Sequence, residues 1–206
     1  MPIKMYSDPT GSGTFTIQSP NSNTNRTLLL PDASTTLVGT DTTQTLTNKT
    51  IQGGTLKYGT SITTNGSTSY DFTGIPSWSK RITVLFNGSS LTTGTSLAIQ
   101  IGSGTIQTTG YVSRADGSGG GSTTATNAFI VTNGFSAAGL AYGSVVLTLF
   151  SGTTWINSGN VGDSTVRTNA STGAVTLSGV LDILRVTTTS GTDAFDGGSV
   201  NILFEG

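Results

Sequence analysis

The segment Arg81–Gly88, RITVLFNG, alternates apolar and polar side chains with a period of two. Ile82, Val84 and Phe86 fall on one side of an extended chain, because successive side chains of a strand point to opposite faces. The segment ends in Asn-Gly, residues that are common in turns. It therefore predicts a strand that buries one face.

Similar segments recur about every 8 to 15 residues along the rest of the chain. In SLAIQIGSG (96–104), Leu97, Ile99 and Ile101 share one face. The others are AFIVTNG (128–134), SVVLTLFSG (144–152), TTWINSG (153–159), STVRTNA (164–170), GAVTLSG (173–179), DILRVTTT (182–189) and SVNILFEG (199–206). About nine or ten strands within residues 70–206 predict an all-β outer domain, a β-sandwich of jelly-roll-like type.

The composition supports a folded, all-β chain. Of 206 residues, 41 are Thr, 29 Gly and 26 Ser, whereas Glu occurs once and Lys four times. Thr, Ser and Gly are poor helix formers, so long helices are not expected. Disorder requires low apolar content together with high net charge, and this chain has 33% hydrophobic residues and a net charge of −1. With nine basic and ten acidic residues in no cluster, nucleic-acid binding is not expected either.

The chain has no cysteine and no histidine. Disulfides are thereby excluded, and so are the commonest general base and metal ligand. The N-terminus, MPIKMYSDPTGSG, lacks the apolar run of a secretory signal, and no stretch of 18 apolar residues predicts a membrane span. We expect no cofactor, no metal and no membrane insertion.

Residues 1–55 form a block of their own. RTLLL (26–30) and TLV (36–38) read as two short strands joined by the turn PDAST (31–35). A ribbon this small is not stable alone. Three copies around an axis could bury its apolar face, so we expect this block to form the trimer and attachment region. Its candidate residues are Leu28, Leu29, Leu30, Leu37, Val38, Leu46 and Ile51. Residues 56–69 are expected to be a connector.

A ligand site is expected on the outer domain. The segment RADGSGGGSTTATN (114–127) predicts a long loop without an apolar anchor, and long loops are usually functional or disordered. Arg114 and Asp116 lie in it, and three aromatic residues, Tyr111, Tyr142 and Trp155, could stack on sugars. Trp155 is expected to face outward if Ile156 faces the core, although a subunit interface would explain it equally well. Either tyrosine could instead be a core residue.

Signals for catalysis are weak. Ser136 in GFSAA (134–138) resembles a nucleophile elbow but has no histidine as base. Asp193 and Asp196 in GTDAFDGG (191–198) supply too few oxygens at the required spacing for a calcium loop, so a turn is favoured. No carboxylate pair indicates a glycosidase. We expect a protein that is not an enzyme.

The stretch LLLPDASTTLVGTDTTQTLTNKTI (28–51) resembles a segment found in structural proteins of tailed bacteriophages, especially fibres. The similarity covers about residues 14–54. In addition, DFTGIPSWSKRITVLFNG (71–88) and TTGYVS (108–113) resemble a C-terminal domain common in phage fibre-like proteins. The resemblance implies a homotrimeric virion appendage with an N-terminal attachment region and a globular outer domain, made in the bacterial cytoplasm.

Two function classes follow. The first is a virion structural protein, a tail, neck or head fibre or a capsid decoration protein, which binds other virion proteins. Host-surface glycans are a further candidate partner of such a protein. The chain has no extended repeat shaft, which points to a small head fibre, neck fibre or decoration protein. The second is a bacterial carbohydrate-binding adhesin module, which would need an export signal.

Overall fold

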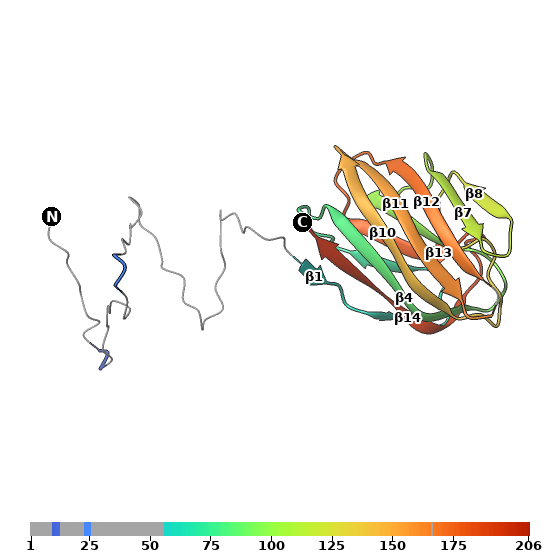
Figure 1. Ribbon diagram of the computed structural model, residues 1–206, viewed down its shortest axis with the longest axis horizontal. Coiled ribbons are helices and arrows are strands. Elements are labelled where there is room, and N and C mark those ends of the chain that lie inside the picture. Colours follow the sequence, from blue (N-terminus) through green and yellow to red (C-terminus); the bar gives the residue numbers. More distant parts are fainter. Residues whose placement is uncertain (1–9, 13–22, 26–55, 166) are drawn as a thin grey trace. The chain divides into compact units, whose positions relative to one another are not determined.

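The computed structural model describes residues 10–12, 23–25, 56–165 and 167–206 (Figure 1). The chain divides into two compact units, Met1–Lys49 and Thr50–Gly206. All seven residues expected to form the trimer and attachment region lie outside the described residues, so that expectation stays a prediction. The described residues form strands, turns and loops, and they include no helix that could cross a membrane.

The larger sheet has nine strands in the described part of the chain and is antiparallel throughout. Its order is β1-β14-β4-β10-β11-β12-β7-β8, and β2 also pairs with β14. The long strands run side by side across one layer of the domain (Figure 1). The strands are β1 (Leu56–Tyr58), β2 (Ile62–Thr63), β4 (Arg81–Leu91), β7 (Val112–Gly117), β8 (Ser122–Ala125), β10 (Ala141–Ser151), β11 (Thr154–Asp163), β12 (Thr168–Thr176) and β14 (Phe195–Glu205).

The second sheet forms the other layer. Its order is β3-β13-β5-β6, and β9 also pairs with β5. The strands are β3 (Tyr70–Thr73), β5 (Leu97–Ser103), β6 (Thr105–Ile106), β9 (Phe129–Ile130) and β13 (Ile183–Thr188). With two antiparallel sheets and no helix among the described residues, the predicted all-β, sandwich-like fold is confirmed.

The core lies between the two sheets. In β4, Ile82, Val84 and Phe86 are buried, as the alternation of RITVLFNG predicts. The facing sheet contributes Leu97, Ile99 and Ile101 from β5, and Leu184 and Val186 from β13. These side chains form one continuous apolar cluster, whose burial is the main favourable term in folding.

Residues 56–69, expected to be a connector, contain paired strands. Leu56 pairs with Glu205 and Tyr58 with Leu203, and Ile62 pairs with Val200. The backbone N–H of Gly59 also donates to the carbonyl of Ile202 at 2.7 Å. Backbone pairing with β14 thus makes Leu56–Tyr58 and Ile62–Thr63 strands of the larger sheet.

Candidate functional site

The segment 114–127, expected to be a long loop, is largely a hairpin of β7 and β8. Arg114 pairs with Thr124, and Asp116 pairs with Ser122. The glycines and serine between the strands form the turn, where Gly120 and Gly121 have positive φ angles of 90° and 84°. The anchors are small, since Ser113 and Ala115 face inward and are buried. The loop expectation is wrong because it considered only large apolar side chains as anchors.

Arg114 and Asp116 project from the same face of β7 and form an ion pair. Nε of Arg114 lies 2.9 Å from each carboxylate oxygen of Asp116, and a terminal nitrogen lies 2.8 Å from Oδ1. The hydrogen bond from Arg114 lowers the pKa of Asp116, and the same bond raises the pKa of Arg114. Because the two charges neutralise each other on an exposed face, the pair offers little net charge to a ligand.

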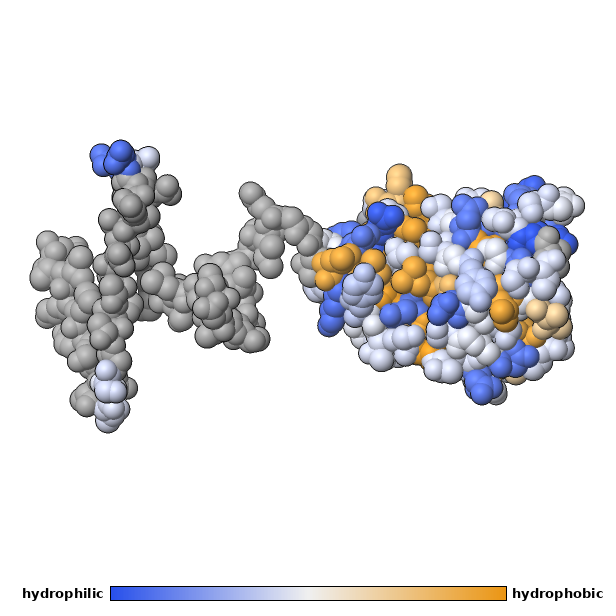
Figure 2. Space-filling model, turned by 60° about the horizontal axis from the view of Figure 1, so that its bottom comes forward, coloured by the Kyte–Doolittle hydropathy of each residue, from blue (hydrophilic) through white to orange (hydrophobic). Residues whose placement is uncertain are grey.

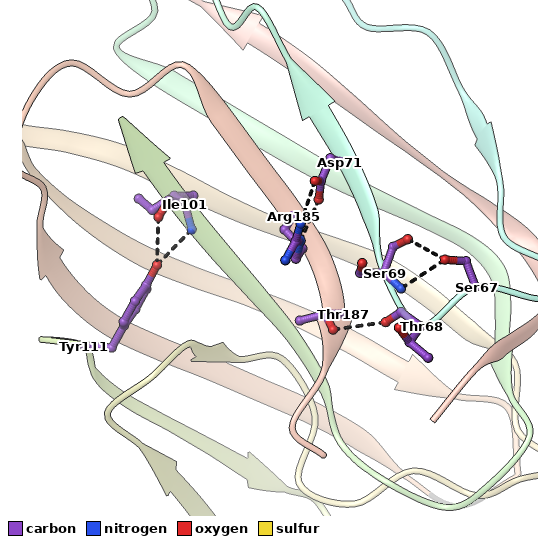
Figure 3. Close-up of polar contacts among 8 residues, drawn as sticks. All are labelled: Ser67, Thr68, Ser69, Asp71, Ile101, Tyr111, Arg185 and Thr187. Atoms are coloured by element: carbon purple, nitrogen blue, oxygen red, sulfur yellow. Dashed lines mark hydrogen bonds and ion pairs between the residues drawn. The ribbon is translucent and has the colours of Figure 1, made fainter. Parts of the chain in front are cut away.

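Tyr111 is a core residue and cannot stack on a ligand. Its side chain is 1% exposed and packs edge to face on Phe129, with ring centroids 4.9 Å apart. The phenol accepts the N–H of Ile101 at 2.8 Å and donates to the carbonyl of Ile101 at 3.1 Å (Figure 3). Burial raises the pKa of Tyr111 to about 12, although the backbone hydrogen bond of Ile101 lowers it in part. The tyrosine thus ties the start of β7 to β5.

Trp155 also belongs to the core, which contradicts the expected outward orientation. Trp155 is 3% exposed, whereas Ile156 is 41% exposed. The next inward residue after Trp155 is Asn157, which donates to the hydroxyl of Ser171 at 2.6 Å inside the sandwich. The condition that Ile156 faces the core is therefore not met, and the outward orientation of Trp155 that depended on it is wrong.

Tyr142 is exposed, but it lies apart from the ion pair. It is 47% exposed and projects from β10, where it pairs with Gly162 of β11. Asp116 is on β7, and β11 and β12 lie between β10 and β7 in the sheet. Of the five predicted ligand-binding residues, the structure brings only Arg114 and Asp116 into contact, and it buries two of the three aromatics.

A groove of about 470 Å³ lies on the outer face of the larger sheet. Residues of three neighbouring strands, β7, β8 and β12, and the residues around them line it, and its surface is mostly apolar. Its outward-facing side chains come from Val112, Arg114, Thr124, Thr172 and Ala174. Val112 and Ala174 were not among the residues predicted to bind a ligand. The sequence signal for them is the period of two in VSRA (112–115) and TGAV (172–175), where outward-facing residues alternate with inward-facing ones.

A second hollow, of about 320 Å³, lies where the edges of the two sheets meet. Its lining includes two charged residues, Lys57 and Asp71, and three apolar ones, Phe72, Ile202 and Phe204. The carboxylate of Asp71 is already held by Arg185, which donates from Nε and Nη2 at 2.7 Å each (Figure 3). The hydrogen bond that Arg185 donates to Asp71 raises the pKa of Arg185. The pair links β3, at the edge of the smaller sheet, to β13.

The remaining acidic loop is a hydrogen-bonded turn. Asp193 accepts the hydroxyl of Ser190 at 2.6 Å, and this bond, with those from Thr93 and Thr95, lowers the pKa of Asp193. Asp196 accepts a hydrogen bond from Ser90. In the part of the chain that the structure describes, no group of three or more acidic, histidine or cysteine side chains could hold a metal ion.

The outer faces of the two sheets differ in how many large apolar side chains they expose. Six of the exposed large apolar or aromatic residues lie in strands of the larger sheet, and among the described residues none lies in a strand of the smaller sheet. These six are Leu56, Tyr58, Val112, Tyr142, Phe150 and Ile156. The outer face of the smaller sheet carries instead a polar row, Asp71, Arg185 and Gln100. Figure 2 shows apolar patches between polar side chains on one face of the globular part.

Comparisons with known proteins returned no relative: no family model, no curated protein and no solved structure matches the chain.

Proposed function

We propose that this chain is a non-enzymatic structural component of a tailed-phage virion, a homotrimeric fibre-like appendage. The observation that carries the proposal is the motif at residues 28–51, which resembles segments of phage structural proteins. In this proposal, residues 1–55 bind other virion proteins and the neighbouring copies, and the β-sandwich forms the outer domain.

The outer domain supports an architectural role. Exposed apolar side chains on only one of two sheets are typical of a surface that contacts another protein. Two observations support a role without catalysis: Ser136 has no histidine to activate it, and Asp71, Asp116 and Asp193 are engaged in hydrogen bonds and ion pairs.

Glycan binding has less support than an architectural role. Sugar sites commonly combine a flat exposed aromatic ring with hydrogen-bonding groups. Tyr111 and Trp155 are buried, and Tyr142 stands apart from Arg114 and Asp116. We therefore favour a head-fibre, neck-fibre or decoration protein over a host-binding tail fibre or a carbohydrate-binding adhesin.

The decisive experiment is imaging of assembled particles. Particles carrying this gene product with a bulky tag fused after Gly206 should show extra density at defined, symmetry-related positions on the particle. Untagged particles of the same preparation are the control. Absence of the protein from purified, complete particles would refute the proposal.

A further inference from the structure

The outer face of the larger sheet carries three neighbouring exposed apolar side chains, those of Val112, Phe150 and Ile156. Val112 pairs with Ala174, Ala174 pairs with Ile156, and Ile156 pairs with Thr148. These residues form one row across four strands, and Phe150 lies two residues beyond Thr148. We define the outer patch as Val112, Phe150, Ile156 and Ala174. Val112 is 74% exposed and Phe150 is 72% exposed.

Phe150 projects because of the local backbone geometry. The pairing of β10 with β11 shifts register between Leu149 and Ser151, so Phe150 occupies a β-bulge. Bulges re-aim a side chain and are common where a strand meets a functional surface. An aromatic ring held out in water by the backbone loses the burial energy that it would gain in an apolar groove.

The groove adjoins the outer patch. Val112 and Ala174 belong both to the patch and to the groove lining. The groove of about 470 Å³ is mostly apolar and open, so it can accept an aromatic side chain from outside. Within one chain, Phe150 lies on β10, and β11 separates this strand from the groove strands. The ring and the groove are thus two separate halves of a contact.

The charged residues beside the outer patch limit which partners can bind it. Arg114 is paired with Asp116 at one side of the patch, and Arg81 lies 3.2 Å from Glu205 at the other side. Each pair is neutral, and the net charge of the whole chain is only −1. A nucleic acid or a strongly charged protein would gain nothing here, whereas a second copy presents the same neutral surface and is not repelled.

We propose that the outer patch is a contact between copies of this chain, in which Phe150 of one copy enters the groove beside Val112 of the next. This inference depends on the proposed homotrimer and names the surface that the copies share. A contact between two different surfaces is heterologous, and it closes into a ring when the rotation fits. Three such contacts complete a trimer, with no groove left empty.

The absence of cysteine allows a direct crosslinking test on the full chain. Ser151 lies next to Phe150, and Thr172 lies at the groove; both are exposed. Within one chain these two positions are roughly 16 Å apart, as four residues of strand rise and two strand spacings give. The double variant Ser151→Cys/Thr172→Cys, treated with a short thiol–thiol crosslinker, should give covalent trimers on a denaturing gel. Either single variant should stay monomeric on the gel, because identical positions do not meet in a heterologous contact.

A matched control uses the opposite face. Thr73→Cys/Thr189→Cys places two exposed thiols on the side of the smaller sheet and should give no covalent trimer. Adding Phe150→Ser to the Ser151→Cys/Thr172→Cys variant should lower the crosslinked fraction by about tenfold or more, since the buried ring is lost. Phe150 is exposed, so this change leaves the sandwich folded.

The outcomes separate the two proposals. If the unmodified chain has the mass of a single chain in solution, the proposed homotrimer fails. If it has the mass of a trimer but the Ser151→Cys/Thr172→Cys variant crosslinks no more than the control, the outer patch is not the contact, and the inference is overturned while the proposed function stands.

Discussion

Trp155 and Ile156 are neighbours in β11, yet they lie on opposite sides of the larger sheet. Trp155 is 3% exposed within the sandwich, and Ile156 is 41% exposed on the outer face. These two consecutive side chains therefore have different roles. Trp155 stabilises the core, and Ile156 belongs to a surface that can contact a second copy.

This pair gives a matched stability prediction. Trp155→Ala should lower the free energy of unfolding by about 3–5 kcal/mol, because it leaves a large cavity between the sheets. Ile156→Ala removes a side chain from the outer patch and none from the core, so it should lower the free energy of unfolding by clearly less than Trp155→Ala does. Urea unfolding followed by tyrosine and tryptophan fluorescence measures both. Equal effects of the two changes would contradict the placement of β11.

Gly173 should resist substitution by any residue with a side chain. A Cβ atom there would lie 2.5 Å from the carbonyl oxygen of Val112 and 2.9 Å from Oδ1 of Asn157. Because the first neighbour is backbone, Gly173→Ala should destabilise the domain by about 1–3 kcal/mol. Gly119 in the β7–β8 turn meets nothing within 4 Å, so Gly119→Ala is the control and should be nearly neutral. If Gly173→Ala left the free energy of unfolding unchanged, β7 and β12 would have to be farther apart than the structure places them.

Much of the fold follows from the sequence, but only where inward positions are large and apolar. The alternation in β4 and β5 places Ile82 and Ile99 correctly. In β7, the inward residue Ser113 is small and polar, so its strand looked like a loop. It is held by a hydrogen bond from the N–H of Ile130 to its hydroxyl at 2.8 Å, which no local pattern reveals.

The candidate site was less predictable for the same reason. The groove is built from the β7–β8 hairpin and from β12, which comes much later in the chain, and its lining residues Val112 and Ala174 are brought together only by the pairing of β7 with β12. Likewise, β1 was expected to be a connector because its partner β14 is at the other end of the described domain. Single-sequence periodicity shows the faces of a strand, but not which strands are neighbours.

The buried phenol of Tyr111 predicts a stability loss at alkaline pH. Its pKa is raised to about 12 in the folded chain, against about 10 in the unfolded chain. Between these values the unfolded chain has released the proton and the folded chain has not, so the folded chain binds more protons. Stability therefore falls as pH rises from about 10 to about 12, by about 2–3 kcal/mol from this group.

Alkaline absorbance titration tests this prediction. The difference between the unmodified chain and Tyr111→Phe should show a phenolate signal with a midpoint near 12. Because Tyr111→Phe also removes two hydrogen bonds to Ile101, its stability at neutral pH should be lower, whereas its loss of stability above pH 10 should be smaller. A difference signal centred at pH 10 would mean that Tyr111 is not buried.

An architectural role predicts that particle adsorption to host cells does not depend on the predicted ligand residues. Asp116→Asn and Tyr142→Ala change positions outside the groove and the outer patch and should leave the fold and adsorption unchanged. Gln100→Ala, on the other sheet, is a control for changes in particle assembly. Adsorption that falls in either of the first two variants, with normal particle yield, would support a host ligand on this face.

The native mass of the purified full chain tests the central claim most directly. Multi-angle light scattering at micromolar concentration should give three times the chain mass of 20.9 kDa, because the account requires neighbouring copies to cover the N-terminal apolar stretch and the outer patch. A mass of one chain under these conditions would contradict the account.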